Sequence, residues 1–220
     1  LLKDNEVFCK TSKIAVAGNH DSKKMYEDIN IYLKKCNADI YKLTSEGPKL
    51  KQLYKTIILF DEPENRSSYI GYSQNSISFT GISGSVKYKN IESPYLKTQR
   101  KALEEAKYLP TADIILSHDK EEFDNSDCLQ KHSHYGLYAI WWYMQRFKAI
   151  NLHGHMHQIY RKGKEYGFFG IQYIRIKKNK FSNKISIKYY SEKKNKFVRI
   201  SLSENNIKIS AGIDLFIGKE

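Results

Sequence analysis

Three short apolar segments, each followed at once by polar residues, limit the fold of this chain more than any other feature. The segments are 14–17, 112–116 and 149–152, and their lengths and compositions predict buried strands. The runs that follow them are Gly18-Asn19-His20-Asp21, Ser117-His118-Asp119 and His153-Gly154-His155-Met156-His157. If the strands are parallel, the three loops emerge at one edge of a sheet, where open α/β sheets bind ligands.

Each polar run has an ordinary structural explanation when it is taken singly. Asn and Asp after a glycine are typical of turns, because both tolerate left-handed backbone and bond their own main chain. A lone His118 is well explained as a core or surface histidine, and His155 and His157 would share a face of any extended segment. Together, however, the runs offer imidazoles and an amide oxygen but no thiolate. Such ligands suit zinc, manganese or iron and argue against a structural cysteine site.

The order GNHD, then a strand ending in His, then GHxH resembles the calcineurin-like metallophosphoesterase superfamily over roughly residues 13–158. The resemblance implies an α/β fold in which a two-sheet sandwich is flanked by helices. It also implies a site with two metal ions bridged by a carboxylate. In that site Asn19, His118 and His155 would ligate one ion, and His157 would ligate the other.

The same resemblance assigns His20 as the acid or charge-stabilising group beside the leaving oxygen, held by Asp21. The ions would be divalent or trivalent, and manganese, iron, zinc, magnesium and cobalt all fit. The family's Asp-x-His and Gly-Asp-x-x-Asp motifs precede GNHD, and neither occurs in residues 1–17. We therefore expect an N-terminally truncated piece of a longer protein whose missing strands carry the bridging carboxylate. Alone, the chain is expected to be inactive or weakly active.

Other polar runs are weaker candidates for a site. His132 and His134 form a second His-x-His in a loop before a predicted helix, where substrate contact from the rim is a better interpretation than metal binding. Asp61 and Glu62 stand before a proline, and turn chemistry explains them. The Gly-Ser turn at 81–85 lacks the GKS/T ending of a phosphate-binding P-loop, so it is expected to be a plain turn.

The composition fits one domain over residues 1–220, with 171–220 as its β-rich C-terminal part. The 220 residues are 40% hydrophobic, which is enough for one sizeable core. No apolar run approaches the length of a membrane span, and the start does not resemble a signal peptide. The three cysteines are scattered, as is typical of free thiols in a reducing compartment. We expect a cytoplasmic protein without membrane contact; the sequence leaves its oligomeric state open.

The net charge of +13 raises the question of nucleic-acid binding. Residues 171–220 contain twelve Lys or Arg against four Asp or Glu, so +8 of that charge lies there. Apolar residues at 185, 187 and 189 alternate with polar ones, which predicts an antiparallel meander whose outer face is solvated by lysine. This interpretation is favoured over a dedicated nucleic-acid surface, although the charge would draw phosphate-bearing substrates toward the site.

Apolar spacing predicts three helices and two further strands outside the segments already named. The helices are 22–36, 95–108 and 137–147, and the strands are 56–60 and 75–80. The first helix would begin directly behind GNHD, and its dipole would favour bound anions there.

These features predict a metal-dependent phosphoesterase that hydrolyses phosphomonoesters or phosphodiesters with a metal-activated hydroxide. The sequence has no GxSxG motif, which agrees with a mechanism that needs no covalent nucleophile. Two alternatives remain open: a non-catalytic truncated remnant or binding piece, and a DNA-processing nuclease of the same superfamily.

Overall fold

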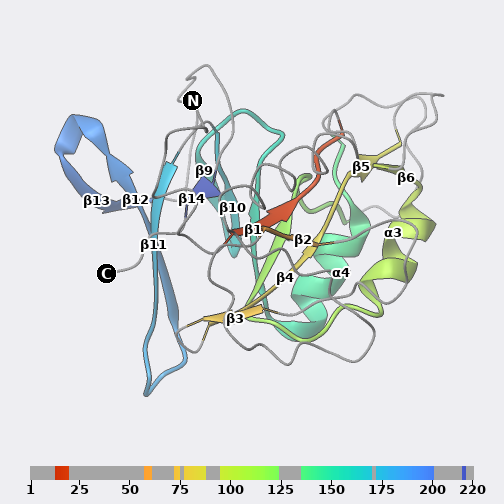
Figure 1. Ribbon diagram of the computed structural model, residues 1–220, viewed down its shortest axis with the longest axis horizontal. Coiled ribbons are helices and arrows are strands. Elements are labelled where there is room, and N and C mark those ends of the chain that lie inside the picture. Colours follow the sequence, from red (N-terminus) through yellow and green to blue (C-terminus); the bar gives the residue numbers. More distant parts are fainter. Residues whose placement is uncertain are drawn as a thin grey trace, which may run out of the picture.

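The computed structural model describes most of the chain from residue 95 onward and shorter segments before it. The described residues are 13–19, 57–60, 72–74, 77–87, 95–123, 135–169, 172–200 and 215–216. They form a mixed α/β structure with several sheets and few helices (Figure 1), in agreement with the predicted α/β class. None of the described helices is long and apolar enough to cross a membrane. The predicted helix 22–36 lies outside the described residues.

The largest sheet has six strands, and its middle strands run parallel. Its order is β3 (Tyr72–Gln74), β4 (Ile77–Ile82), β7 (Ile114–Ser117), β8 (Ile150–His153), β10 (Glu165–Gly167) and β9 (Tyr160–Lys162). Strands β4, β7, β8 and β10 pair in parallel, whereas β3 and β9 are antiparallel edges. Ser117 pairs with His153 at the ends of β7 and β8. The loops after these two strands therefore leave the sheet at the same edge, as the sequence predicts.

Both faces of this sheet are covered, which explains why β7 and β8 consist of residues that are all buried. On β7, Ile114 and Leu116 belong to one cluster of buried side chains, and Ile115 belongs to another. Helices α3 (Gln99–Ala106) and α4 (Tyr138–Phe147) contribute to the Ile115 cluster and lie on one side of the sheet (Figure 1). Helix α4 confirms the helix predicted over 137–147.

A four-stranded sheet contributes to the other cluster. Its order is β13 (Lys196–Arg199), β12 (Ile185–Ser191), β11 (Gln172–Lys178) and β14 (Leu215–Phe216), and a short 3-10 helix, Glu192–Lys194, joins β12 to β13. Strands β11, β12 and β13 are antiparallel, which confirms the predicted meander. Ile174, Ile187 and Ile200 share their cluster with β7 and β8. Lys178 Nζ donates to both carboxylate oxygens of Asp113, at 2.8 and 2.9 Å, and so ties β11 to the residue before β7.

Strand β1 (Lys13–Val16) belongs to a separate pair and not to the six-stranded sheet. It hydrogen-bonds in parallel with β2 (Ile57–Phe60) and contacts β4 and β7 through packing, with Val16 against their cluster. Ala17 is held at the end of β4, because its N–H donates to Ser83 Oγ at 2.9 Å and its carbonyl accepts from Gly84 N at 2.7 Å. The expectation that all three loops leave one sheet is therefore wrong for β1, because its backbone hydrogen bonds go to β2.

The segment predicted as a helix over 95–108 begins as a strand. Leu96–Lys97 form β6, which pairs in parallel with β5 (Ser85–Val86), and α3 begins at Gln99 after the cap Thr98. Thr98 Oγ1 accepts from Lys101 N at 3.2 Å, which fixes the start of the helix.

The turn predicted at 81–85 is shorter than expected, because β4 continues to Ile82 and β5 starts at Ser85. Gly84 has a φ of 86°, and a Cβ there would lie 2.4 Å from the Tyr95 carbonyl oxygen. Only glycine fits this close approach between the turn and β6.

Candidate metal centre

Two of the candidate ligands follow neighbouring strands of the six-stranded sheet. His118 comes directly after β7, and His155 comes two residues after β8. His155 and His157 both have left-handed backbone, with φ of 57° and 52°, and Met156 N donates to Gly154 O at 2.6 Å. The segment is therefore a turn and not an extended strand. The expectation that His155 and His157 share one face of an extended segment is wrong. Non-glycine residues with positive φ are uncommon and gather at functional sites.

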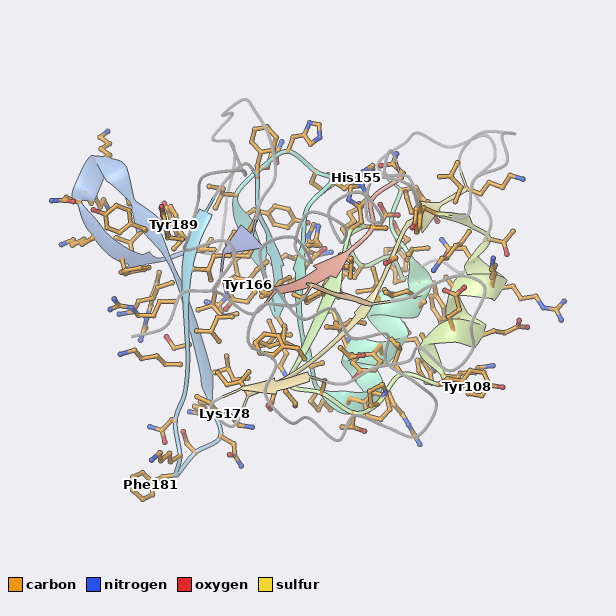
Figure 2. The ribbon with its side chains drawn as sticks, viewed as in Figure 1. Tyr108, His155, Tyr166, Lys178, Phe181 and Tyr189 are labelled. Atoms are coloured by element: carbon orange, nitrogen blue, oxygen red, sulfur yellow. The ribbon has the colours of Figure 1, made fainter. Side chains whose placement is uncertain are left out.

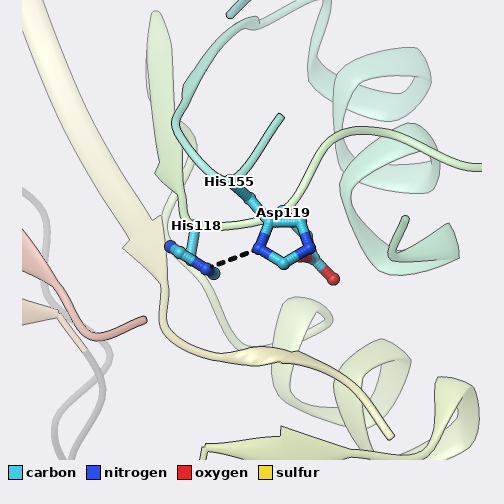
Figure 3. A group of neighbouring side chains, drawn as sticks. All are labelled: His118, Asp119 and His155. Atoms are coloured by element: carbon cyan, nitrogen blue, oxygen red, sulfur yellow. Dashed lines mark hydrogen bonds and ion pairs between the residues drawn. The ribbon is translucent and has the colours of Figure 1, made fainter. Parts of the chain in front are cut away.

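Asn19, His118 and His155 meet in the structure although they come from three separate loops. His118 Nε2 lies 2.8 Å from Asn19 Oδ1 and 2.9 Å from His155 Nδ1. The two imidazole rings meet edge to face, with centroids 4.7 Å apart (Figure 3). His155 is buried and the other two side chains are half-buried, so the group is largely screened from water.

The chemistry of these three atoms fits a cation better than it fits a set of hydrogen bonds. An amide oxygen only accepts, and each neutral imidazole nitrogen carries either a proton or a lone pair. The single proton on His118 Nε2 could serve only one of the two short contacts well. Two ligands about 2.1 Å from a metal ion, at angles of 90–109°, lie about 3.0–3.4 Å apart. The observed separations of 2.8 and 2.9 Å are close to that spacing.

Gly18 allows the Asn19 loop to approach the histidines. A Cβ at Gly18 would lie 2.9 Å from both Cε1 and Nδ1 of His118, which is closer than real contacts allow. The glycine before Asn19 is therefore required by the packing of β1 against the end of β7.

Asp119 is the fourth residue of the group and lies next to Nε2 of His155. Its carboxylate is fully buried, and its Oδ2 accepts hydrogen bonds from Ser85 Oγ and Val86 N, both at 2.9 Å. Its Oδ1 accepts no hydrogen bond from the described part of the chain and lies 3.7 Å from His155 Nε2. Because burial penalises the charged carboxylate, the pKa of Asp119 is raised to about 7, although Val86 N–H, the Ser85 hydroxyl and Lys120 act to lower it.

The ligand atoms of His118, Asp119 and His155 all lie within 4.8 Å of one another (Figure 3). A carboxylate on the second nitrogen of a histidine fixes the tautomer that presents the first nitrogen to a metal. Asp119 is thus suited to orient His155. The role of Asp119 was not predicted from the sequence, because it depends on Ser85 and Val86, which are far away in the chain. Its position directly after His118 was the only available signal.

We expect that Asp119→Ala lowers the affinity for Mn²⁺ or Zn²⁺ by about 10–100-fold, as is typical for a residue that orients a metal ligand. Asp119→Asn should lose less affinity, because an amide oxygen at this position keeps an acceptor facing the Nε2 side of His155. Isothermal titration of the folded variants measures both effects. Ser85→Ala is the control, since it weakens the support of Asp119 without removing the carboxylate. Unchanged affinity in Asp119→Ala would show that the carboxylate does not orient His155.

The remaining histidines of the third run lie outside this group. His157 is exposed, and its ring stacks on Phe169 with centroids 5.0 Å apart. His153 is buried, and its Nε2 lies 2.8 Å from the Tyr160 hydroxyl and 3.1 Å from Glu165 Oε1. Burial would raise the pKa of Glu165, but hydrogen bonds from His153, Glu121 N–H and Tyr160 hold it below the ordinary value.

Several residues named from the sequence cannot be placed. His20, Asp21, Asp61, Glu62, His132 and His134 lie outside the described residues.

No protein-family model matches this chain, and neither a curated protein nor a solved structure is significantly similar to it. The assignment of a metal centre therefore rests on the geometry of the residues themselves.

Proposed function

We propose that this protein is a metal-dependent phosphoesterase that hydrolyses phosphomonoesters or phosphodiesters. The observation that carries the proposal is the convergence of Asn19 Oδ1, His118 Nε2 and His155 Nδ1 from three loops. The proposal includes the two-sheet sandwich flanked by helices that the resemblance implies. The packing of β1 against β4 and β7, and of β2 against β4, supports it. It also includes a cytoplasmic location, which the scattered cysteines favour.

Asn19, His118 and His155 would hold one divalent or trivalent ion through neutral nitrogens and a carbonyl oxygen. An ion bound there supplies a Lewis acid that lowers the pKa of water and neutralises charge on a phosphoryl group. The chain's own contribution is to fix the ligands: Gly18 permits the close approach, and Asp119 orients His155. A second ion, with His157 as its ligand, enters the proposal through the sequence resemblance.

His20→Ala should reduce turnover by about 10²–10⁴-fold, the usual loss when general acid help is removed. Metal content should stay near that of the unsubstituted protein, because His20 is assigned to proton donation or charge stabilisation and not to metal binding. Metal analysis and steady-state kinetics on the same preparation separate the two roles. An equal loss of metal in His20→Ala and His155→Ala would mean that His20 is a ligand.

The proposed function is tested by assaying p-nitrophenyl phosphate and bis-p-nitrophenyl phosphate with Mn²⁺, Zn²⁺, Fe²⁺, Co²⁺ or Mg²⁺. We expect hydrolysis of at least one ester that depends on added metal and is lost in His118→Ala. Metal binding without hydrolysis of either ester, when the full-length natural protein is assayed, would overturn the phosphoesterase proposal and favour a non-catalytic metal-binding protein. Hydrolysis that survives in His118→Ala would contradict the assigned site.

A further inference from the structure

The outer face of the sheet formed by β11, β12 and β13 combines aromatic and cationic side chains in two rows. The strand register places Tyr190 opposite Phe197, and Lys188 opposite both Arg175 and Arg199. The alternate positions Ile174, Ile187 and Ile176 pack on the core, so the first set of residues faces the other way. Figure 1 shows this sheet at the side of the molecule away from α3, and Figure 2 shows its side chains.

The aromatic row consists of Tyr173, Tyr190 and Phe197, one from each strand. The ring centroids of Tyr173 and Tyr190 are 6.4 Å apart, and those of Tyr190 and Phe197 are 5.4 Å apart. Tyr173 is 61% exposed, whereas Tyr189, on the opposite face of β12, packs against the core. Tyr190 and Phe197 are half-buried, so the row offers one exposed and two partly exposed rings on which other planar groups can stack.

The cationic row lies beside the aromatic row. It consists of Arg175, Lys188 and Arg199, and Lys177 follows Arg175 on the same face of β11. Arg175 lies over the Phe197 ring, with its guanidinium carbon 4.0 Å from the centroid, and so joins the two rows. None of the described strand positions on this face carries a carboxylate.

Solvation of this face alone does not explain why the aromatic and cationic side chains form two aligned rows. Like charges opposite one another on neighbouring strands destabilise a sheet, and ordinary surfaces mix both signs. A polyanionic ligand would relieve the repulsion among Arg175, Lys188 and Arg199. From the sequence alone a lysine-solvated face was the favoured interpretation, because alternation does not show that Tyr173, Tyr190 and Phe197 align across three strands.

We propose that this outer face binds single-stranded nucleic acid. The bases stack on Tyr173, Tyr190 and Phe197, and the phosphates lie along the row of Arg175, Lys188 and Arg199. A duplex fits poorly, because its bases are already stacked within the helix and cannot reach the rings. This proposal does not involve the metal centre, so it can be tested independently of the proposed phosphoesterase activity.

The test is fluorescence anisotropy of the full chain with labelled 12-nucleotide oligo(U) and oligo(dT), and with a duplex of the same length. We expect saturable binding of a single strand that is tighter than binding of the duplex. Tyr173→Ala should weaken it by about 5- to 150-fold, the effect of losing one stacked base. Tyr108→Ala is the matched control, since Tyr108 is 64% exposed after the end of α3 and should leave binding unchanged. Phe197→Leu, which keeps an apolar side chain without the ring, should weaken binding as well.

The charge contribution is tested separately through the salt dependence of binding. Replacing Lys177 and Lys188 with glutamine should reduce the slope of log affinity against log salt by about 0.7 for each lost phosphate contact. Replacing Lys101 and Lys107, which are exposed on and after α3, is the control and should leave the slope unchanged. Equal effects of Tyr173→Ala and Tyr108→Ala, equal affinity for the duplex, or binding only to vesicles of anionic lipid would each overturn the proposal.

Discussion

Replacing His118 with alanine should remove tight metal binding and lower metal-dependent phosphoesterase turnover by about 10³-fold or more, since a bound ion supplies several kcal/mol of transition-state stabilisation. His118 is central to the group because its Nε2 lies 2.8 Å from Asn19 Oδ1 and 2.9 Å from His155 Nδ1. Metal titration and steady-state kinetics on the folded variant measure the two losses.

His157→Ala is the control for this prediction. His157 is exposed and lies outside the group, so its loss should leave the affinity for the first ion unchanged. Any effect should be confined to a second ion. Wild-type affinity in His118→Ala, or equal loss of the first ion in both variants, would contradict the assignment of the three ligands.

Glu105→Ala should destabilise the folded protein by about 3–5 kcal/mol, the usual cost of removing one member of a buried ion pair. Lys97 is completely buried in β6, and its Nζ donates to Glu105 Oε2 on α3. Chemical unfolding followed by circular dichroism measures the free energy of unfolding. The variant should unfold at clearly lower urea concentration.

The matched control is Glu104→Ala on the same helix. Glu104 pairs with Arg100 at 3.2 Å, but both side chains are mostly exposed, and exposed pairs contribute little. Its removal should change the free energy of unfolding by no more than about 0.5 kcal/mol. Similar destabilisation by the two substitutions would show that the Lys97–Glu105 pair is not the buried contact that joins β6 to α3.

The elements that depend on local pattern could be predicted from the sequence. Strands β7 and β8 and helix α4 have the expected positions, because apolar run length and helical spacing are local properties. The predicted start of α3 was wrong because Leu96 and Lys97 also fit a helical pattern. Their strand conformation depends on pairing with β5 and on the distant carboxylate of Glu105.

The candidate site could be predicted only in part. The residue types and their order indicated Asn19, His118 and His155 as candidate ligands, and the structure brings these three residues together. The orienting role of Asp119 depends on hydrogen bonds from β5, which no local pattern shows. The left-handed turn at His155 likewise depends on how the loop packs and not on the spacing of the two histidines.

X-ray absorption at the zinc edge, on protein loaded with one equivalent of Zn²⁺, tests the metal centre most directly. We expect zinc ligands that are nitrogen and oxygen only, with two imidazoles at about 2.0–2.1 Å. His118→Ala and His155→Ala, measured at protein concentrations above their weakened dissociation constants, should each show one imidazole fewer. A set of ligands that contains sulfur, or one that keeps both imidazoles in these variants, would contradict the assigned metal centre.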